Sequence, residues 1–120
     1  MTTKRTSRPA AKSVPILRPH VLVLHGPNLN LLGSREPKHY GIATLDSINQ
    51  ALVSRGEAVG ALVETFQNNH EGALVDWIHE AGRLHAAGEL AGVVLNAGAY
   101  THTSVALLDA IKGTGVALIE

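Results

Sequence analysis

Arg35 and Tyr40 are the side chains of this sequence whose types and spacing best suit acid–base chemistry. They lie in residues 25–41, a segment of about seventeen residues with no strand or helix pattern and with glycines that could act as hinges. Loops of this length are usually functional lids or disordered segments. A tyrosine hydroxyl has a pKa of about 10, so a phenolate at neutral pH costs about 4 kcal/mol, and a nearby arginine lowers that cost. The segment predicts either a lid with an arginine-activated tyrosine or a solvated Arg35 beside a surface Tyr40.

Residues 95–104 form a second polar segment, in which Asn96 follows an apolar run and His102 lies near the start of a helix pattern. An asparagine amide and the backbone N–H groups of a helix N-terminus together suit hydroxyl groups or an anion. The helix dipole there favours the neutral form of His102. The other interpretation is that His102 is a surface residue near a helix cap.

A third polar turn, residues 67–72, follows residues 61–66, which we expect to form a strand. We expect Asn68 or Asn69 to cap the helix after it rather than to bind a ligand. No metal site is predicted, because the sequence has no cysteine and no paired histidine motif, and His79 and His85 lie on different helix faces. It also lacks a P-loop and the GxGxxG dinucleotide motif.

These polar segments lie between alternating strand and helix patterns. The predicted strands are 21–24, 61–66, 91–95 and 115–119; the predicted helices follow a cap at Thr44, span 71–87, and run from a cap at Thr101 or Thr103 to Lys112, with Gly56, Gly88 and Gly113 after their ends. This order predicts an α/β fold with a parallel sheet, right-handed crossovers and helices on both faces. Ligands of such sheets bind beyond the carboxyl ends of the strands, where the strand order switches, and all three polar segments begin there.

The composition fits one globular domain: 120 residues, 45% of them hydrophobic and 17% charged. The formal net charge is zero, but residues 1–20 carry five basic and no acidic side chains, and residues 21–120 carry five basic and ten acidic ones. We expect residues 1–19 to be a disordered basic tail and residues 20–120 the domain. An acidic domain argues against a nucleic-acid partner, and no apolar run approaches the ~20 residues that span a membrane. We therefore expect a soluble protein of the cytoplasm.

Four motifs together resemble type II 3-dehydroquinase (3-dehydroquinate dehydratase). They are GPNLNLLG at 26–33, REPKHYG at 35–41, QNNHEG at 67–72 followed by LVDWIH at 74–79, and NAGAYTHTS at 96–104. The resemblance covers roughly residues 20–120, in the order and at the spacing of the family. It implies a flavodoxin-like fold of three layers, α-β-α, around a parallel sheet. It also implies a lyase that dehydrates 3-dehydroquinate to 3-dehydroshikimate, by anti elimination through an enolate, in the shikimate pathway.

The resemblance assigns four residues to catalysis. Tyr40 matches the base that takes the proton from the carbon beside the ketone, and Arg35 matches the residue that lowers its pKa. Asn28 matches a residue that helps to hold the water stabilising the enolate. Glu120 matches the acid that orients the catalytic histidine. Such an intermediate needs a poised base, an electrostatic cradle and a general acid for the leaving hydroxyl.

Substrate binding and assembly are also implied by the resemblance. Asn96 and His102 match residues that bind substrate hydroxyls, and Asp109 matches an acidic residue that reaches a neighbouring subunit's site. The family uses no cofactor and no metal, and its members assemble as trimers packed into a dodecamer. In the family a His-x-Ser-Asn segment, whose histidine is the general acid, begins two residues beyond the position of Glu120. A final strand and helix follow it.

We therefore expect a domain without its last strand and helix. The alternative function is a truncated form of the same fold, catalytically impaired or acting only in ligand binding or interaction. An unrelated small-ligand domain of the same fold is disfavoured by the lid motif. A type I dehydroquinase is excluded, since its barrel cannot be built from 120 residues.

Overall fold

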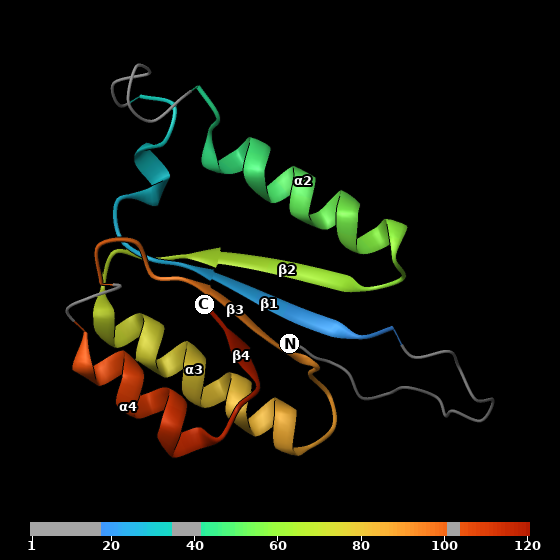
Figure 1. Ribbon diagram of the computed structural model, residues 1–120, viewed down its shortest axis with the longest axis vertical. Helices are drawn as coiled ribbons and strands as arrows, with labels where there is room; N and C mark the ends of the chain where they lie inside the picture. Colours follow the sequence, from blue (N-terminus) through green and yellow to red (C-terminus); the bar gives the residue numbers. More distant parts are fainter. Residues whose placement is uncertain (1–17, 35–41, 101–103) are drawn as a thin grey trace.

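The computed structural model describes residues 18–34, 42–100 and 104–120 (Figure 1). Arg35, Tyr40 and His102 lie outside the described residues, so their predicted roles are not tested by the coordinates. Asn28, Asn96, Asp109 and Glu120 are described.

Four parallel strands form the sheet: β1 His20–His25, β2 Leu62–Gln67, β3 Gly92–Asn96 and β4 Leu118–Ile119. Their order across the sheet is β2-β1-β3-β4 (Figure 1). The chain therefore moves first to one side of β1 and then to the other, which is the strand order of flavodoxin-like folds. The predicted α/β class and parallel sheet are confirmed.

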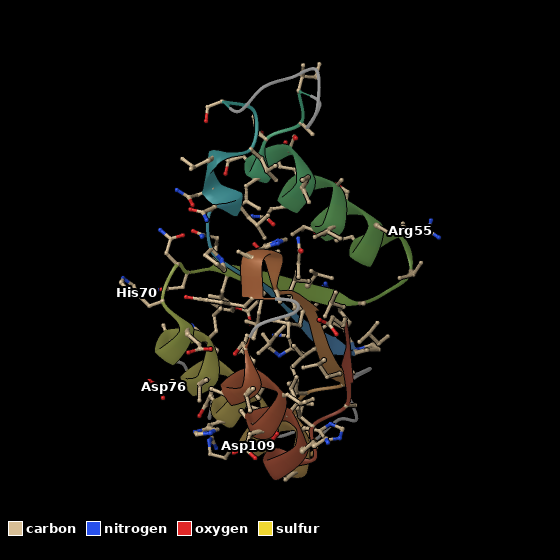
Figure 2. All side chains as sticks on the ribbon, turned by 60° about the vertical axis from the view of Figure 1, so that its left-hand side comes forward. Arg55, His70, Asp76 and Asp109 are labelled. Atoms are coloured by element: carbon tan, nitrogen blue, oxygen red, sulfur yellow. The ribbon has the colours of Figure 1, made fainter. Side chains whose placement is uncertain are left out.

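Helices cover both faces of the sheet. Helix α2 (Leu45–Ala58) lies on one face, and α3 (Glu71–Ala86) and α4 (Val105–Thr114) lie side by side on the other (Figure 1). This division follows from right-handed crossovers. The connection from β1 to β2 and the connections toward β3 and β4 run in opposite directions across the sheet, so their helices lie on opposite faces. Each helix exposes a charged residue on its outer side: Arg55, Asp76 and Asp109 (Figure 2).

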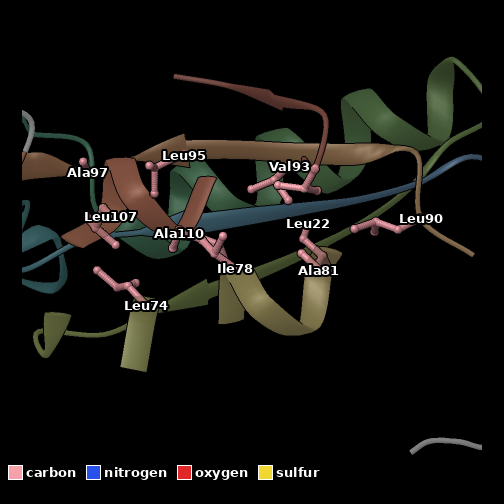
Figure 3. Packing of buried hydrophobic residues seen from close by; sticks show 12 residues of the cluster. Leu22, Leu74, Ile78, Ala81, Leu90, Val93, Leu95, Ala97, Leu107 and Ala110 are labelled. Atoms are coloured by element: carbon pink, nitrogen blue, oxygen red, sulfur yellow. The ribbon is translucent and has the colours of Figure 1, made fainter. Parts of the chain in front are cut away.

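The hydrophobic core lies between the sheet and the helices α3 and α4 (Figure 3). Leu22 and Leu24 of β1 face Leu74 and Ile78 of α3, and all four side chains are buried. The helix predicted over residues 71–87 thus packs one apolar face against the sheet. Alternation along β1 turns Val23 and His25 toward the opposite face, which α2 covers. The apolar face of α2, made by Leu45, Ile48, Leu52 and Val53, is only half-buried, with Val53 36% exposed.

Two helix boundaries differ from the sequence prediction. Gly56 lies inside α2 rather than after its end. A larger residue would not fit there, because a Cβ would lie 2.5 Å from the Val63 side chain of β2. Glycine at this position serves close helix–sheet packing. Helix α4 begins with Ser104 as its N-cap, not Thr101 or Thr103, since the Ser104 hydroxyl accepts a hydrogen bond from the N–H of Leu107.

The end of α4 and the last strand also depart from expectation. The helix runs past Gly113 to Thr114 and ends at Gly115, which adopts a left-handed conformation with φ 66°. Strand β4 is consequently short, pairing Leu118 with Val93 and Ile119 with Val94. The cap at Thr44 is as predicted, with Thr44 and Ser47 forming a reciprocal capping box.

None of the helices within the described residues combines the length and apolar character needed to cross a membrane.

A substitution at Gly26 tests how closely β1 and β3 must approach. A Cβ there would lie 2.2 Å from the carbonyl oxygen of Ala97, so we expect Gly26→Ala to destabilise the domain by about 3 kcal/mol. Gly72→Ala is the matched control: its Cβ would meet nothing within 4 Å, and alanine favours the helix by about 0.5–1 kcal/mol. Urea unfolding measures both, and equal stabilities of the two variants would contradict the prediction.

Candidate active site at the switch point of the sheet

Three neighbouring strands end in polar residues at the same edge of the sheet. In the parallel register, His25 at the end of β1 is level with Gln67 of β2 and with Asn96 of β3. The strand order reverses between β1 and β3, and open α/β sheets bind ligands at such a switch point. The candidate site is therefore the space beyond the carboxyl ends of β1, β2 and β3.

The loops that leave β1 and β3 touch through their backbones. The Gly26 N–H donates to the carbonyl oxygen of Asn96 at 2.8 Å, which extends the ladder past the strand ends. Gly98, with φ 62°, lies close to the loop after β1. A Cβ on Gly98 would lie 3.2 Å from the carbonyl oxygen of Pro27. Both loops are thus held against the edge of the sheet on which Asn28 and Asn96 lie.

Gln67 joins the loop after β1 to the loop after β2. Its Nε2 lies 3.1 Å from the Gly26 carbonyl oxygen, 3.1 Å from Asn69 Oδ1 and 3.3 Å from Asn30 Oδ1, so one amide group donates among three acceptors. Sequence reasoning did not assign Gln67 a role. Its signal was its place directly after the predicted strand 61–66, at the edge of the sheet where ligands bind.

Asn28 is held in an unusual backbone conformation beside this amide. It is the one described non-glycine residue with positive φ, 69°, and it begins a short 3₁₀ turn over Leu29–Leu31. Its N–H donates to Asn69 Oδ1 at 3.0 Å. Asparagine tolerates the left-handed region better than most residues. The fixed backbone conformation of Asn28 limits the directions in which its side chain can point.

The expectation that Asn68 or Asn69 caps α3 is wrong. His70 is the N-cap residue and makes no side-chain cap hydrogen bond. Asn68 Oδ1 instead accepts from the His70 N–H at 2.8 Å, which closes the turn before the helix. The Asn69 oxygen is used by Asn28 and Gln67, as described above.

His25 and Asn96 form a polar pair where β1 and β3 end. His25 is only 2% exposed, and its Nδ1 lies 3.3 Å from Asn96 Nδ2. Its Nε2 lies 2.9 Å from Oδ1 of Asn49 in α2. The sequence placed Asn96 at this edge correctly, but it gave His25 no role in the site.

The turns before α3 and α4 are tied together at the same edge. The Ser104 hydroxyl donates to a Glu71 carboxylate oxygen, which joins the first residue of α3 to the N-cap of α4. The Tyr100 hydroxyl donates to the carbonyl oxygen of Asn69 at 3.2 Å. The N-terminal ends of both helices therefore lie beside the site, and their dipoles favour negative charge there.

The two remaining predicted residues lie apart from this cluster. Asp109 is exposed on the outer side of α4 (Figure 2). Glu120 is exposed and follows Ile119, which pairs with Val94, so its backbone is level with Leu95 of the neighbouring strand. Glu120 is thus one residue short of the level of Asn96, at the same edge of the sheet.

No cluster of three or more histidine, cysteine or acidic side chains suited to a metal ion occurs in the part of the chain that the structure describes. His85 is engaged elsewhere, with its Nδ1 3.0 Å from the Leu90 carbonyl oxygen. The pKa of the Glu80 carboxyl is lowered because Arg83, one helical turn away, donates two hydrogen bonds to it. That pair lies on the solvent side of α3 and serves the helix surface.

A model of the family described as dehydroquinase class II matches residues 19–120. The chain belongs to this family. The 3-dehydroquinate dehydratase of Acidovorax sp. (strain JS42) is 67% identical over 100 residues, which cover 83% of this chain and 68% of the relative. The 3-dehydroquinate dehydratase of Variovorax paradoxus (strain S110) is 60% identical over the same shares.

Solved structures give the same assignment for this dehydroquinase. The crystal structure of the type II dehydroquinase from Butyrivibrio crossotus DSM 2876 matches with a TM-score of 0.76 and 37% identity, over 83% of this chain and 66% of that one. The chain spans about two thirds of the length of the relatives it matches. The predicted family is therefore confirmed.

Replacing Gln67 in this dehydroquinase tests whether one amide holds the loops together. Gln67→Glu would direct a carboxylate at three oxygen acceptors, and we expect a loss of about 1–3 kcal/mol of stability. Faster hydrogen exchange of the amides of residues 26–34 should accompany it. Gln50→Glu, on the exposed side of α2, is the control and should change stability by less than about 0.5 kcal/mol. Unchanged loop exchange in Gln67→Glu would contradict the role assigned to Gln67.

Proposed function

We propose that this protein dehydrates 3-dehydroquinate to 3-dehydroshikimate, a step of the shikimate pathway. The observation that carries the proposal is the family match over residues 19–120, together with relatives of 60–67% identity that are named for this activity. The polar edge at the switch point of the sheet supports it. Asparagine amides and two helix N-termini suit a ligand that bears hydroxyl groups and a negative charge.

The reaction proceeds in two steps through an enolate. Tyr40, with its pKa lowered by Arg35, takes the proton from the carbon beside the ketone, and the electron pair of that bond forms the enolate. A water held with the help of Asn28 stabilises the enolate oxygen. The carbon–oxygen bond of the leaving hydroxyl then breaks. The proton that turns this hydroxyl into water comes from the general-acid histidine that the family carries two residues beyond the position of Glu120, and Glu120 orients that histidine.

Asn96 and His102 bind the substrate hydroxyls in this proposal. The described contacts on either side of His102 support its role, because Tyr100 is bonded to Asn69 and Ser104 to Glu71 at the edge of the sheet. The reaction needs neither cofactor nor metal. Asp109 reaches the site of a neighbouring subunit.

We propose a trimer-based dodecamer for the assembled enzyme. Asp109 shares the outer surface of α4 with Val105, 77% exposed, and Leu108, 51% exposed, and an acidic residue among exposed apolar ones suits a subunit contact. We place the enzyme in the cytoplasm. Residues 1–19 act as a tail, and residues 20–120 form the domain.

A second candidate is a form that binds the ligand without turning it over. The chain spans about two thirds of the length of the relatives it matches. Turnover and ligand-induced stabilisation, measured on the same protein, distinguish the two candidates.

The first test is formation of 3-dehydroshikimate from 3-dehydroquinate, followed by ultraviolet absorbance, by the 120-residue chain and by the same chain extended past Glu120 with the family's final segment. We expect turnover in the extended chain that a metal chelator does not change, and turnover in the 120-residue chain lowered about 100-fold or more by the missing general acid. Asn96→Ala should lower kcat/KM about 10- to 100-fold, because a substrate hydroxyl loses its partner. Gln50→Ala, on the exposed side of α2, is the control and should leave kcat/KM unchanged.

Absence of turnover together with a rise of Tm on adding 3-dehydroquinate would favour the binding form. Absence of both would contradict the proposed function. Wild-type activity in Asn96→Ala would contradict the role of that residue.

A further inference from the structure

His25 is the one side chain that is both polar and buried among the residues the structure describes, at 2% exposure. It ends β1 on the face of the sheet that α2 covers, where its neighbour Val23 is also buried. An apolar side chain would fill such a position without the cost of desolvating an imidazole. The presence of a histidine at this buried position must therefore be explained by the hydrogen bonds of its two ring nitrogens.

The partners of His25 define the direction of both hydrogen bonds. Oδ1 of Asn49 can only accept, so Nε2 of His25 must carry the proton that it donates over 2.9 Å. Nδ2 of Asn96 can only donate, so Nδ1 of His25 must be the unprotonated acceptor at 3.3 Å. The three side chains form one directed chain, from Asn96 through His25 to Asn49.

This chain has a consequence for the amide of Asn96. Its Nδ2 is turned toward the buried ring of His25, so its Oδ1 is on the opposite side of the amide, and the residue itself is exposed. Without a fixed partner, the amide could rotate and offer either an acceptor or a donor to a ligand. With His25 as acceptor, Asn96 offers an oxygen.

We infer that His25 is a positioning residue, which sets the amide of Asn96 so that Oδ1 accepts a hydrogen bond from a hydroxyl of the substrate. This inference rests on the proposed function, because it specifies how the binding residue of that site is oriented. Asn49 fixes the tautomer of His25, since its oxygen accepts a hydrogen bond from Nε2 and so keeps the proton on that nitrogen. Helix α2, which contributes no other residue to the proposed site, thereby influences substrate binding.

Two substitutions separate the two contacts of the ring. In His25→Asn the short amide occupies the place of Nδ1, so the contact with Asn96 is kept and the contact with Asn49 is lost. In His25→Gln the longer amide occupies the place of Nε2, so the contact with Asn49 is kept and the contact with Asn96 is lost. Both variants bury one amide at the same position and should lower Tm by similar amounts.

The expected result is a difference in KM. His25→Gln should raise the KM for 3-dehydroquinate about tenfold, the effect of one misplaced hydrogen bond, while His25→Asn should stay within about threefold of the wild type. In the background of Asn96→Ala, His25→Gln should cause no further rise, because its effect acts through Asn96. Equal KM values for the two variants, or additive effects with Asn96→Ala, would overturn the inference.

Nuclear magnetic resonance provides a readout that needs no substrate. The ring nitrogens of His25 should show the proton on Nε2, and the side-chain NH₂ protons of Asn96 should exchange faster with solvent in His25→Gln than in His25→Asn, because only the latter keeps their acceptor. A proton on Nδ1, or equal exchange of the Asn96 NH₂ protons in the two variants, would overturn the inference. If the expected signals are seen but the wild-type chain neither binds nor converts 3-dehydroquinate, the positioning role stands and the proposed function fails.

Discussion

The close contact between β1 and β3 where they leave the sheet is the constraint on which the candidate site depends. Gly26 lies against the backbone of Ala97, and its N–H donates to the carbonyl oxygen of Asn96. Only this approach brings the loop that carries Asn28 beside the strand that ends in Asn96. Because the strand order reverses between these two strands, the contact also opens the edge of the sheet to a ligand.

The polar residues at this edge are satisfied by one another in two separate groups. Gln67 and Asn69 hold the loop after β1 and the backbone of Asn28, while Asn49 and His25 hold the amide of Asn96. The first group fixes the backbone of Asn28 and the second the side-chain amide of Asn96. Groups held in this way lose less entropy when a ligand binds, which is how a rigid scaffold raises affinity and selectivity.

Much of the fold could be predicted from local patterns. The strand β1, the helix α3 and the cap at Thr44 each depend on neighbours in sequence, and the structure agrees with the prediction for all three. The errors arose where tertiary packing decides. Glycine disfavours helices, so Gly56 predicts a helix end, but its lack of a side chain serves the contact with Val63 inside α2. The turn after β2 likewise uses Asn69 to hold Asn28, 41 residues away in sequence, rather than to cap α3.

The sequence by itself determined the family, the alternation of strands and helices, and the edge of the sheet at which Asn28 and Asn96 belong. These features follow from the order of the motifs and from hydrophobic periodicity, which are properties of short stretches of chain. Only the tertiary structure decided that His25 and Asn49 orient Asn96 and that Gln67 secures the loop of Asn28. The physical reason is that a hydrogen bond between distant residues depends on strand register and side-chain direction, which exist only once the sheet and its helices have packed.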